Sequence, residues 1–284
     1  MNMPFRSGAG VALCVCALAL SSSFAAEPVP APPTSAQSPT QAPLRDWQPE
    51  AEALLNKMAK FMSTTQRFAV DIRSGYDVVQ DSGQKIEFGD TRHITVVRPD
   101  RMRIEVEDNE GDRRLVLFDG KQLTVYGATN NVYAQAQAPA DLDKAIGYFV
   151  QGLRMRLPLA AWFLSRLPDE LNSRVRSLSY VGPVSFRGYP AHHLAGRADE
   201  VDFQLWVADG DKPVLLRVVL TYRLAEGQPQ FWAEFSGWNL APKVTDEMFA
   251  FTPPQGAQKI VFLRQLRGAA AQAQPGAEQK GVQP

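Results

Sequence analysis

The feature that most constrains this chain is a hydrophobic alternation of period two, repeated in segments that hairpin turns separate. From Phe68 to Val78 the even positions are mostly apolar, whereas Asp71, Arg73 and Asp77 lie between them. Successive side chains of a strand point to opposite faces, so this pattern is typical of a half-buried strand. Turn sequences such as Asp81-Ser82-Gly83 divide the later runs. The alternation therefore predicts an antiparallel meander.

A helical pattern interrupts this alternation over residues 139–168. Its first apolar residues, Leu142, Ile146, Phe149 and Leu153, are spaced by four, three and four positions. A second apolar segment contains Leu157, Leu159, Trp162, Phe163 and Leu164. An amphipathic pattern also follows Pro49, with Leu54, Leu55, Met58, Phe61 and Met62 on one stripe. These patterns predict an N-terminal helix and a central helical pair beside the strands.

The expected fold class is mainly β (α+β). We count about eleven strands, and a sheet of that length has to curl strongly or close. The predicted architecture is a curved, antiparallel, half-open β-barrel, with the N-terminal helix at its start and the central helices as a lid or plug.

The ends of the chain predict export. Residues 1–25 combine Arg6, an apolar run and small residues before Ala26, as a cleaved signal peptide does. A membrane anchor is the alternative, but the run is shorter than the about 20 residues that a spanning helix needs. A lipid-modified Cys14 or Cys16 is a further alternative, although Leu13 and Val15 precede them. Cleavage removes both cysteines and leaves no transmembrane span. The expected location is the periplasm.

The remaining chain divides by composition. Residues 26–45 are rich in Pro and Ala and predict a disordered tether, and residues 268–284 predict a disordered tail. Residues 46–267 form the predicted barrel domain. The 30 Lys and Arg residues balance the 30 Asp and Glu residues, so a nucleic-acid partner is not expected.

The best candidate for a binding site is the apolar face of the strands together with the central helices. The same pattern would also serve a packed core, and both interpretations stay open. Trp206, Trp232 and Trp238 are further candidates for its wall or rim. The candidate ligand-binding residues are Phe68, Ile72, Tyr76, Phe88, Ile94, Val96, Trp162, Phe163, Leu216, Val218 and Leu220, and Val214 precedes the last three in the same alternation.

No pattern in the sequence indicates catalysis, a metal site or a cofactor. His192 and His193 are adjacent and would point to opposite faces of a regular strand, so they cannot chelate one ion together. The arginines at positions 98, 101, 103, 113 and 114 are interpreted as a solvated face rather than a docking patch for anionic lipid. A serine paired with His192 or His193 is the remaining route to a hydrolase.

Several short segments resemble a family of predicted periplasmic proteins of unknown function. They include Arg98-Pro99-Asp100-Arg101, Phe118-Asp119-Gly120-Lys121, Val201-Asp202-Phe203-Gln204-Leu205-Trp206, Asp209-Gly210-Asp211-Lys212-Pro213 and Trp238-Asn239-Leu240. That family is similar to the outer-membrane lipoprotein carriers and receptors (LolA/LolB-like), in which a half-barrel with a helical lid shields acyl chains.

The resemblance implies a non-catalytic periplasmic protein that binds an apolar ligand, an acyl chain, a lipid or a lipoprotein. The alternative is a sensor or scaffold that binds another envelope protein while its own side chains fill the barrel. An uncharacterised hydrolase ranks below both.

Overall fold

The computed structural model describes residues 45–155 and 159–262, which belong to a compact unit that begins at Arg45. The predicted signal peptide, nearly all of the predicted tether and the predicted tail lie outside the described residues. So do Leu157 of the second apolar segment and the predicted domain boundary at residue 267.

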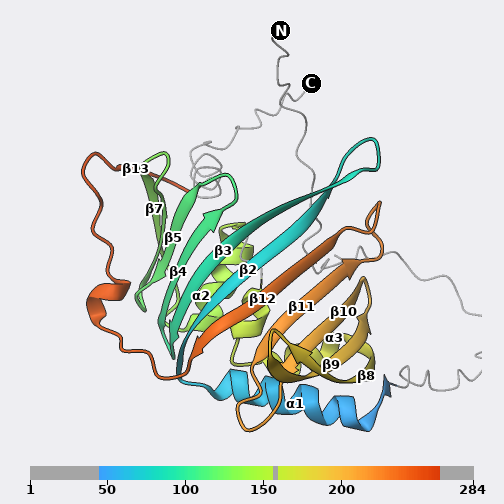
Figure 1. Ribbon diagram of the computed structural model, residues 1–284. Coiled ribbons are helices and arrows are strands. Elements are labelled where there is room, and N and C mark those ends of the chain that lie inside the picture. The colour runs from blue at the N-terminus through green and yellow to red at the C-terminus, as the bar shows by residue number, and fades with distance from the viewer. Residues whose placement is uncertain (1–44, 156–158, 263–284) are drawn as a thin grey trace, which may run out of the picture. The chain divides into compact units, whose positions relative to one another are not determined.

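A single curved sheet of thirteen strands dominates this unit (Figure 1). Its first meander consists of β2 (Arg67–Val79), β3 (Lys85–Val97), β4 (Arg101–Asp108), β5 (Arg113–Phe118), β6 (Gln122–Gly127) and β7 (Val132–Gln137). Its second consists of β8 (Val175–Phe186), β9 (Tyr189–Ala198), β10 (Val201–Ala208), β11 (Leu215–Tyr222) and β12 (Gln230–Asn239). β12 pairs antiparallel with β2 and joins the two meanders.

The sheet is open, and its two edges are short strands that pair in parallel. β1 (Asp46–Trp47) pairs with β8, and β13 (Gln258–Ile260) pairs with β7. The strand number is therefore thirteen rather than the expected eleven or so, because these two edge strands are too short to show an alternation.

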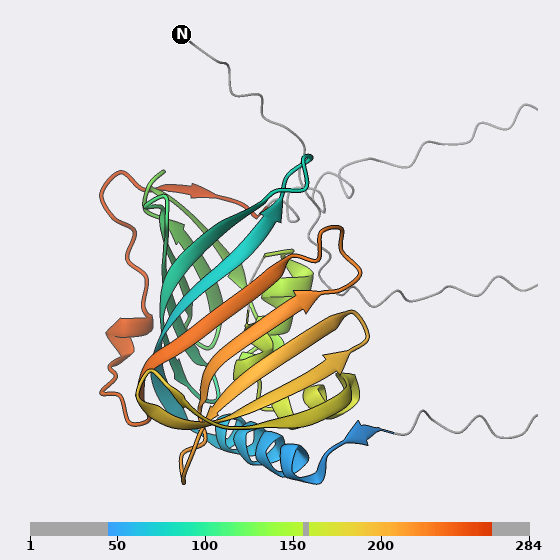
Figure 2. The same ribbon diagram turned by 45° about the vertical axis from the view of Figure 1, so that its right-hand side comes forward.

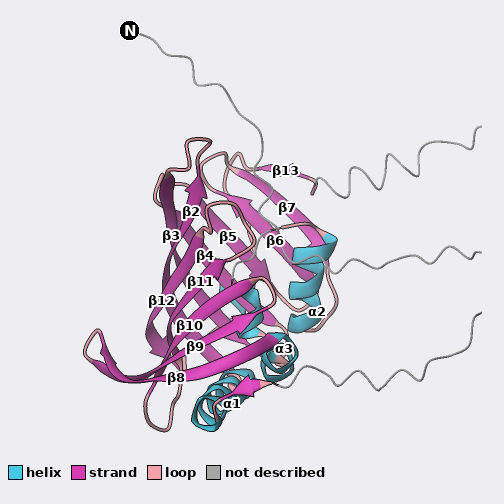
Figure 3. Ribbon diagram, turned by 90° about the vertical axis from the view of Figure 1, so that its right-hand side faces the viewer, coloured by secondary structure: helices cyan, strands magenta, loops and turns pink. Residues whose placement is uncertain are grey.

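The helices lie at one end of the sheet and inside its curve (Figures 2 and 3). α1 (Pro49–Thr64) begins at a proline in its first turn and buries Leu55, Met58 and Met62 against the main core. The central helical elements are α2 (Leu142–Gly147), the π turn η1 (Tyr148–Gly152), the 3₁₀ turn η2 (Ala160–Phe163) and α3 (Leu167–Arg174). A further 3₁₀ turn, η3 (Asp246–Phe249), follows β12.

One predicted alternation is broken by a β-bulge. The register between β10 and β11 shifts at Trp206 and Val207, so that Val207 pairs with Leu215. Leu215 and Val218 therefore face the main core, while Val214 and Leu216 join Ala191 in a second, smaller cluster. The expectation that Val214, Leu216, Val218 and Leu220 share one face is wrong for the first two.

The outer face carries a ladder of stacked side chains across β9 to β12. His193 stacks on Trp206 with ring centroids 4.2 Å apart, and the Arg217 guanidinium lies 5.5 Å from Trp206 and 5.6 Å from Trp232. Trp206 and Trp232 thus stabilise the outer surface and do not line the inner face, contrary to the expectation for them. Trp238 instead packs against both clusters.

Gly89 marks the closest approach of neighbouring strands. A Cβ there would lie 2.5 Å from the Ser74 carbonyl oxygen of β2, which cannot move without its strand. We expect Gly89→Ala to lower the free energy of unfolding by about 1–3 kcal/mol, measured by urea denaturation. Gly127→Ala is the control, because its nearest contact would be an ordinary 3.9 Å to Val132. Equal stability of both variants would contradict the expected clash.

Candidate functional site

The inner wall of the candidate site consists of the even positions of β2 and β3. Phe68, Ile72, Ile94 and Val96 are each at most 2% exposed and belong to the main core cluster. Phe68 pairs with Val96, and Val70 pairs with Ile94, so the two strands present one continuous apolar surface. This surface is the face that the alternation predicts.

The opposite wall is a helical segment, which we define as residues 142–155 and 159–174. Its buried side chains pack into the same cluster as the sheet. Phe163 stacks on Phe68 with ring centroids 5.7 Å apart, and Trp162 is 9% exposed. The other buried residues of this segment are Leu142, Ala145, Ile146, Phe149, Leu153, Leu159, Leu164 and Leu167. The described helical segment therefore covers the inner face, as a plug would.

Arg98 ties the helical segment to the sheet. Its Nη2 donates to the Phe163 carbonyl at 2.6 Å, and its Nε donates to the Thr65 carbonyl at 3.2 Å. Its Nη1 lies 3.8 Å from Asp143 Oδ1, and the side chain is 8% exposed. Burial lowers the pKa of this guanidinium, and Asp143 and Asp141 oppose the shift. Arg98 is thus buried and connects the helical segment to the end of β3. The expectation of a solvated arginine is wrong for this residue.

Asp143 extends this connection within the helical segment. Its carboxylate accepts the Ser165 backbone N–H at 3.0 Å and the Ser165 hydroxyl at 2.6 Å. Ser165, which follows the 3₁₀ turn η2, is thereby linked to α2 and, through Arg98, to the sheet.

The backbone of the helical segment is irregular. α2 gives way to a π turn after six residues, and only four residues form the 3₁₀ turn η2. Arg154 and Leu159 adopt left-handed φ values of 58° and 68° without being glycine. Each such residue costs about 1–3 kcal/mol, and strain of this kind gathers at ligand clamps and switches. The segment is therefore less regular than β2 and β3, which pair along their whole length without a register shift.

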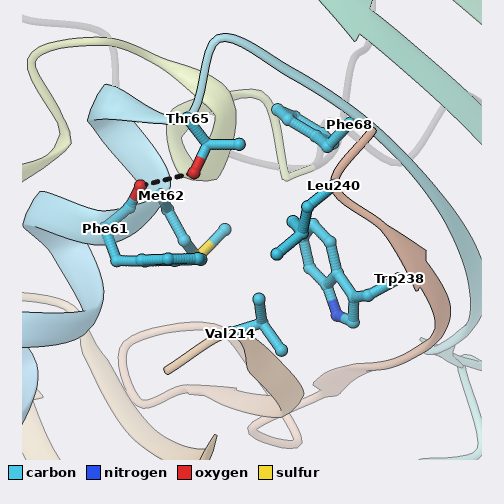
Figure 4. Close-up of a pocket in the computed structure, with 7 residues that line it drawn as sticks. All are labelled: Phe61, Met62, Thr65, Phe68, Val214, Trp238 and Leu240. Atoms are coloured by element: carbon cyan, nitrogen blue, oxygen red, sulfur yellow. Dashed lines mark hydrogen bonds between the residues drawn. The ribbon is translucent and has the colours of Figure 1, made fainter. Parts of the chain in front are cut away.

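A small cavity borders the inner face at Phe68. An apolar cavity of about 10 Å³ lies where the end of α1 meets the sheet (Figure 4). Its lining residues are Phe61, Met62, Thr65, Phe68, Val214, Trp238 and Leu240. A water molecule needs about 10–15 Å³ measured in this way. This cavity cannot hold an acyl chain.

The candidate residues divide into three groups by position. Phe68, Ile72, Ile94, Val96, Trp162, Phe163 and Val218 are buried together in the main core. Tyr76 and Leu220 are partly buried against that core, and Phe88 stacks on Tyr76 with centroids 6.1 Å apart. Leu216 lies in the smaller cluster and does not join the others.

A buried polar group lies on the inner face beside these residues. Arg92 pairs across the strands with Ile72 and precedes Ile94 on the same face of β3. Its Nη2 donates to Asp90, which also accepts the Ser74 hydroxyl at 2.7 Å. All three residues are at most 8% exposed. The apolar face predicted from the sequence did not include this group, although the charged Arg92 stands at an even position of β3 and could have indicated it.

The two adjacent histidines point to different surroundings, as predicted. His192 contacts the Tyr180 hydroxyl at 3.0 Å and Asp209 Oδ1 at 3.1 Å, whereas His193 contacts Gln204 and Trp206. The hydrogen bond from His192 lowers the pKa of Asp209, but burial raises the pKa of the Tyr180 hydroxyl. A raised pKa disfavours the phenolate form of Tyr180.

A larger hollow lies on the outer face. It has a volume of about 440 Å³ and is lined by His93, Thr95, Arg103, Glu105, Thr245, Glu247 and Met248. His93 and Thr95 alternate with the buried Ile94 and Val96, which places this groove opposite the core. Its charged lining does not suit an apolar chain.

Two findings on the described residues bear on metals and membranes. No group of three or more His, Cys, Asp and Glu side chains in the described part of the chain could hold a metal ion. Within the same ranges, 45–155 and 159–262, every helix is too short or too polar to span a bilayer.

Together, the curved open sheet and the helical segment packed against its inner face define a mainly β fold with one apolar interior. Residues 51–263 match the model of a family described as predicted periplasmic protein (DUF2092), and the chain belongs to this family. The family that the sequence motifs indicate is confirmed. A search of curated protein sequences returned no match.

Solved structures of similar fold come from several bacteria. The chain is similar to the lipoprotein LppX of Mycobacterium tuberculosis, at 14% identity over 69% of this chain and 99% of that chain, with a TM-score of 0.45. It is similar to LprF of Mycobacterium bovis, at 15% identity over 74% of this chain and 98% of that chain, with a TM-score of 0.44. A LolA superfamily protein of Nitrosomonas europaea matches at 12% identity over 71% of this chain and 97% of that chain, with a TM-score of 0.34.

Proposed function

We propose that this protein works in the periplasm, without catalysis, and binds an apolar ligand such as an acyl chain between the inner face of the sheet and the helical segment. The observation that carries this proposal is the irregular backbone of the helical segment beside the regularly paired, apolar strands β2 and β3. We infer that a cover with a π turn and two strained residues opens at a lower cost than the paired strands beside it.

The net free energy of binding is the difference between two terms: the gain from burying the ligand chain and the loss from uncovering the side chains that it displaces. A chain of about 16 carbons gains on the order of 10 kcal/mol on transfer from water to an apolar site. The ligand has to displace side chains such as Phe163 that already cover the sheet. The observed affinity is therefore the intrinsic affinity reduced by the small population of the open state.

Native mass spectrometry of protein purified from its own periplasm tests the proposal. We expect an added mass that an organic extract releases, and a fluorescent fatty acid that unlabelled fatty acid displaces from the stripped protein. A ligand-free spectrum together with no displaceable fatty acid would refute ligand binding.

A second candidate function is an envelope interaction module, and the filled interior favours it. The side chains of the helical segment already pack into the same core as the inner face, and the apolar cavity of about 10 Å³ at the end of α1 is too small for a chain. Crosslinking in the intact envelope distinguishes the two. One recurring protein partner without any co-purified lipid would support the module and exclude the carrier.

A further inference from the structure

The apolar inner face contains one charged group whose hydrogen bonding is incomplete. Arg92 is 8% exposed, and its Nη1 has no hydrogen-bond partner among the described residues. Its Nη2 is paired with Asp90, whose other oxygen accepts the Ser74 hydroxyl. One nitrogen with two N–H donors is therefore buried and unused.

A packed core gains nothing from this arrangement. Taking a guanidinium and a carboxylate out of water costs several kcal/mol per ion, and apolar residues of similar size are often as stable or more stable. The neighbours of Arg92 show that this site accepts apolar side chains, because Ile72 and Val106 flank it across the sheet and Ile94 follows it. An unsatisfied buried donor of this kind calls for a partner that the described residues do not supply.

We propose that Arg92 Nη1 receives the carboxylate of an acyl ligand, so that the ligand class is a long-chain fatty acid or a similar carboxylate-terminated chain. This inference rests on the proposed function, which places the ligand between the inner face of the sheet and the helical segment. The alkyl chain then lies along Ile72, Ile94 and Val96, and its carboxylate accepts hydrogen bonds from Nη1.

Local charges favour a carboxylate over a phosphate. Asp90 already neutralises Arg92, and the next cation, Arg114, is paired with Asp108 at 3.6 Å. Phe88 and Tyr76 stack beside this group and add no positive charge. A singly charged headgroup would meet the two N–H donors of Nη1. A phosphate ester of nearly two negative charges would lie near the Asp90 carboxylate, and the described residues around Arg92 offer it no second unpaired cation.

The test compares three probes of equal chain length: palmitate, hexadecanol and hexadecyl phosphate. Each displaces a neutral fluorescent alkyl probe from the full chain at about pH 8, where a carboxylic acid is ionised. We expect palmitate to bind about tenfold or more tightly than hexadecanol, as a hydrogen bond to a charged group predicts. Hexadecyl phosphate is expected to bind less tightly than palmitate.

The variant that tests the role of Arg92 keeps the buried charges balanced. In the double variant Asp90→Asn, Arg92→Gln, the preference for palmitate over hexadecanol should disappear while hexadecanol still binds. Arg114→Gln, which removes a nearby and more exposed arginine, is the control and should retain most of the preference. Unfolding curves of all variants verify that each protein tested is folded.

Each other outcome overturns the inference in a distinct way. Equal affinity of the normal protein for palmitate and hexadecanol would refute the carboxylate site and leave the proposed function intact. If the double variant still prefers palmitate over hexadecanol, Arg92 does not bind the headgroup. If hexadecyl phosphate binds more tightly than palmitate, the ligand class is not a carboxylate-terminated chain. Displacement by none of the probes would overturn both proposals.

Discussion

Replacing Phe163 with alanine is expected to weaken the fold and strengthen ligand binding at the same time. Phe163 is 4% exposed and stacks on Phe68, so its loss should lower the free energy of unfolding by about 3–5 kcal/mol. Under the proposed function these contacts keep the helical segment closed, so their loss should populate the ligand-accepting open state. Urea denaturation measures the first effect and titration with a fluorescent fatty acid the second, for which we expect a gain of about tenfold or more.

Phe249→Ala is the matched control, because it should lower stability without raising the affinity for fatty acid. Phe249 is 3% exposed, but it lies in η3, which packs against β4, and the Arg101 guanidinium covers its ring at 5.9 Å. We expect a comparable loss of stability and no gain in affinity. If Phe163→Ala binds fatty acid no better than Phe249→Ala does, the helical segment is a permanent core element.

Arg98→Ala should release the helical segment through its polar contacts. The change leaves the carbonyls of Phe163 and Thr65 without their donor and Asp143 without its buried cation. We expect a loss of about 2–4 kcal/mol in the free energy of unfolding. Hydrogen exchange should show the loss first at backbone amides of the segment, such as those of Trp162 and Leu164, while β2 and β3 keep their protection.

Arg101→Ala provides the comparison for Arg98→Ala. Arg101 pairs with Asp246, whose side chain is almost fully exposed, so its removal should change stability by about 1 kcal/mol or less. The contrary result is that Arg98→Ala loses hydrogen-exchange protection evenly over the sheet and the helical segment. It would show that Arg98 stabilises the whole core and does not act only on the helical segment.

The antiparallel strands were predictable because their side chains alternate over enough residues to show a period. β2 and β3 each contain thirteen residues, and the burial of Phe68, Ile72, Ile94 and Val96 follows the even positions. α1 was predictable for the same reason, with Pro49 at its start and Leu55, Met58 and Met62 one helical turn apart. Local periodicity suffices where an element is long and half-buried.

The parts that sequence reasoning missed depend on contacts between distant segments. β1 and β13 have two and three residues and exist because β8 and β7 offer them an edge. The bulge at Trp206 and Val207 moves Leu216 to the other side of the sheet, and no residue in the alternation of β11 indicates it. α3, over Leu167–Arg174, begins where the predicted helical pattern of residues 139–168 ends, so most of this helix was not predicted.

The two arginines of the interior show why site residues are harder to predict than walls. In sequence, Arg98 is one of five nearby arginines, and only the approach of Phe163 and Asp143 makes it buried. Arg92 occupies an even position between Asp90 and Ile94, where the alternation assigns it to the inner face. Polarity suggests a solvated side chain for both, whereas their burial is a property of the assembled fold.

The most direct test of ligand binding at the inner face is methyl NMR with a spin-labelled fatty acid. The label broadens signals of methyl groups close to the bound chain. We predict broadening at Ile72, Ile94, Val96 and Val218, while the exposed Val181, Val184 and Leu224 keep sharp signals. Sharp signals at the four buried residues with broadening at the exposed ones would show surface adsorption and contradict the account.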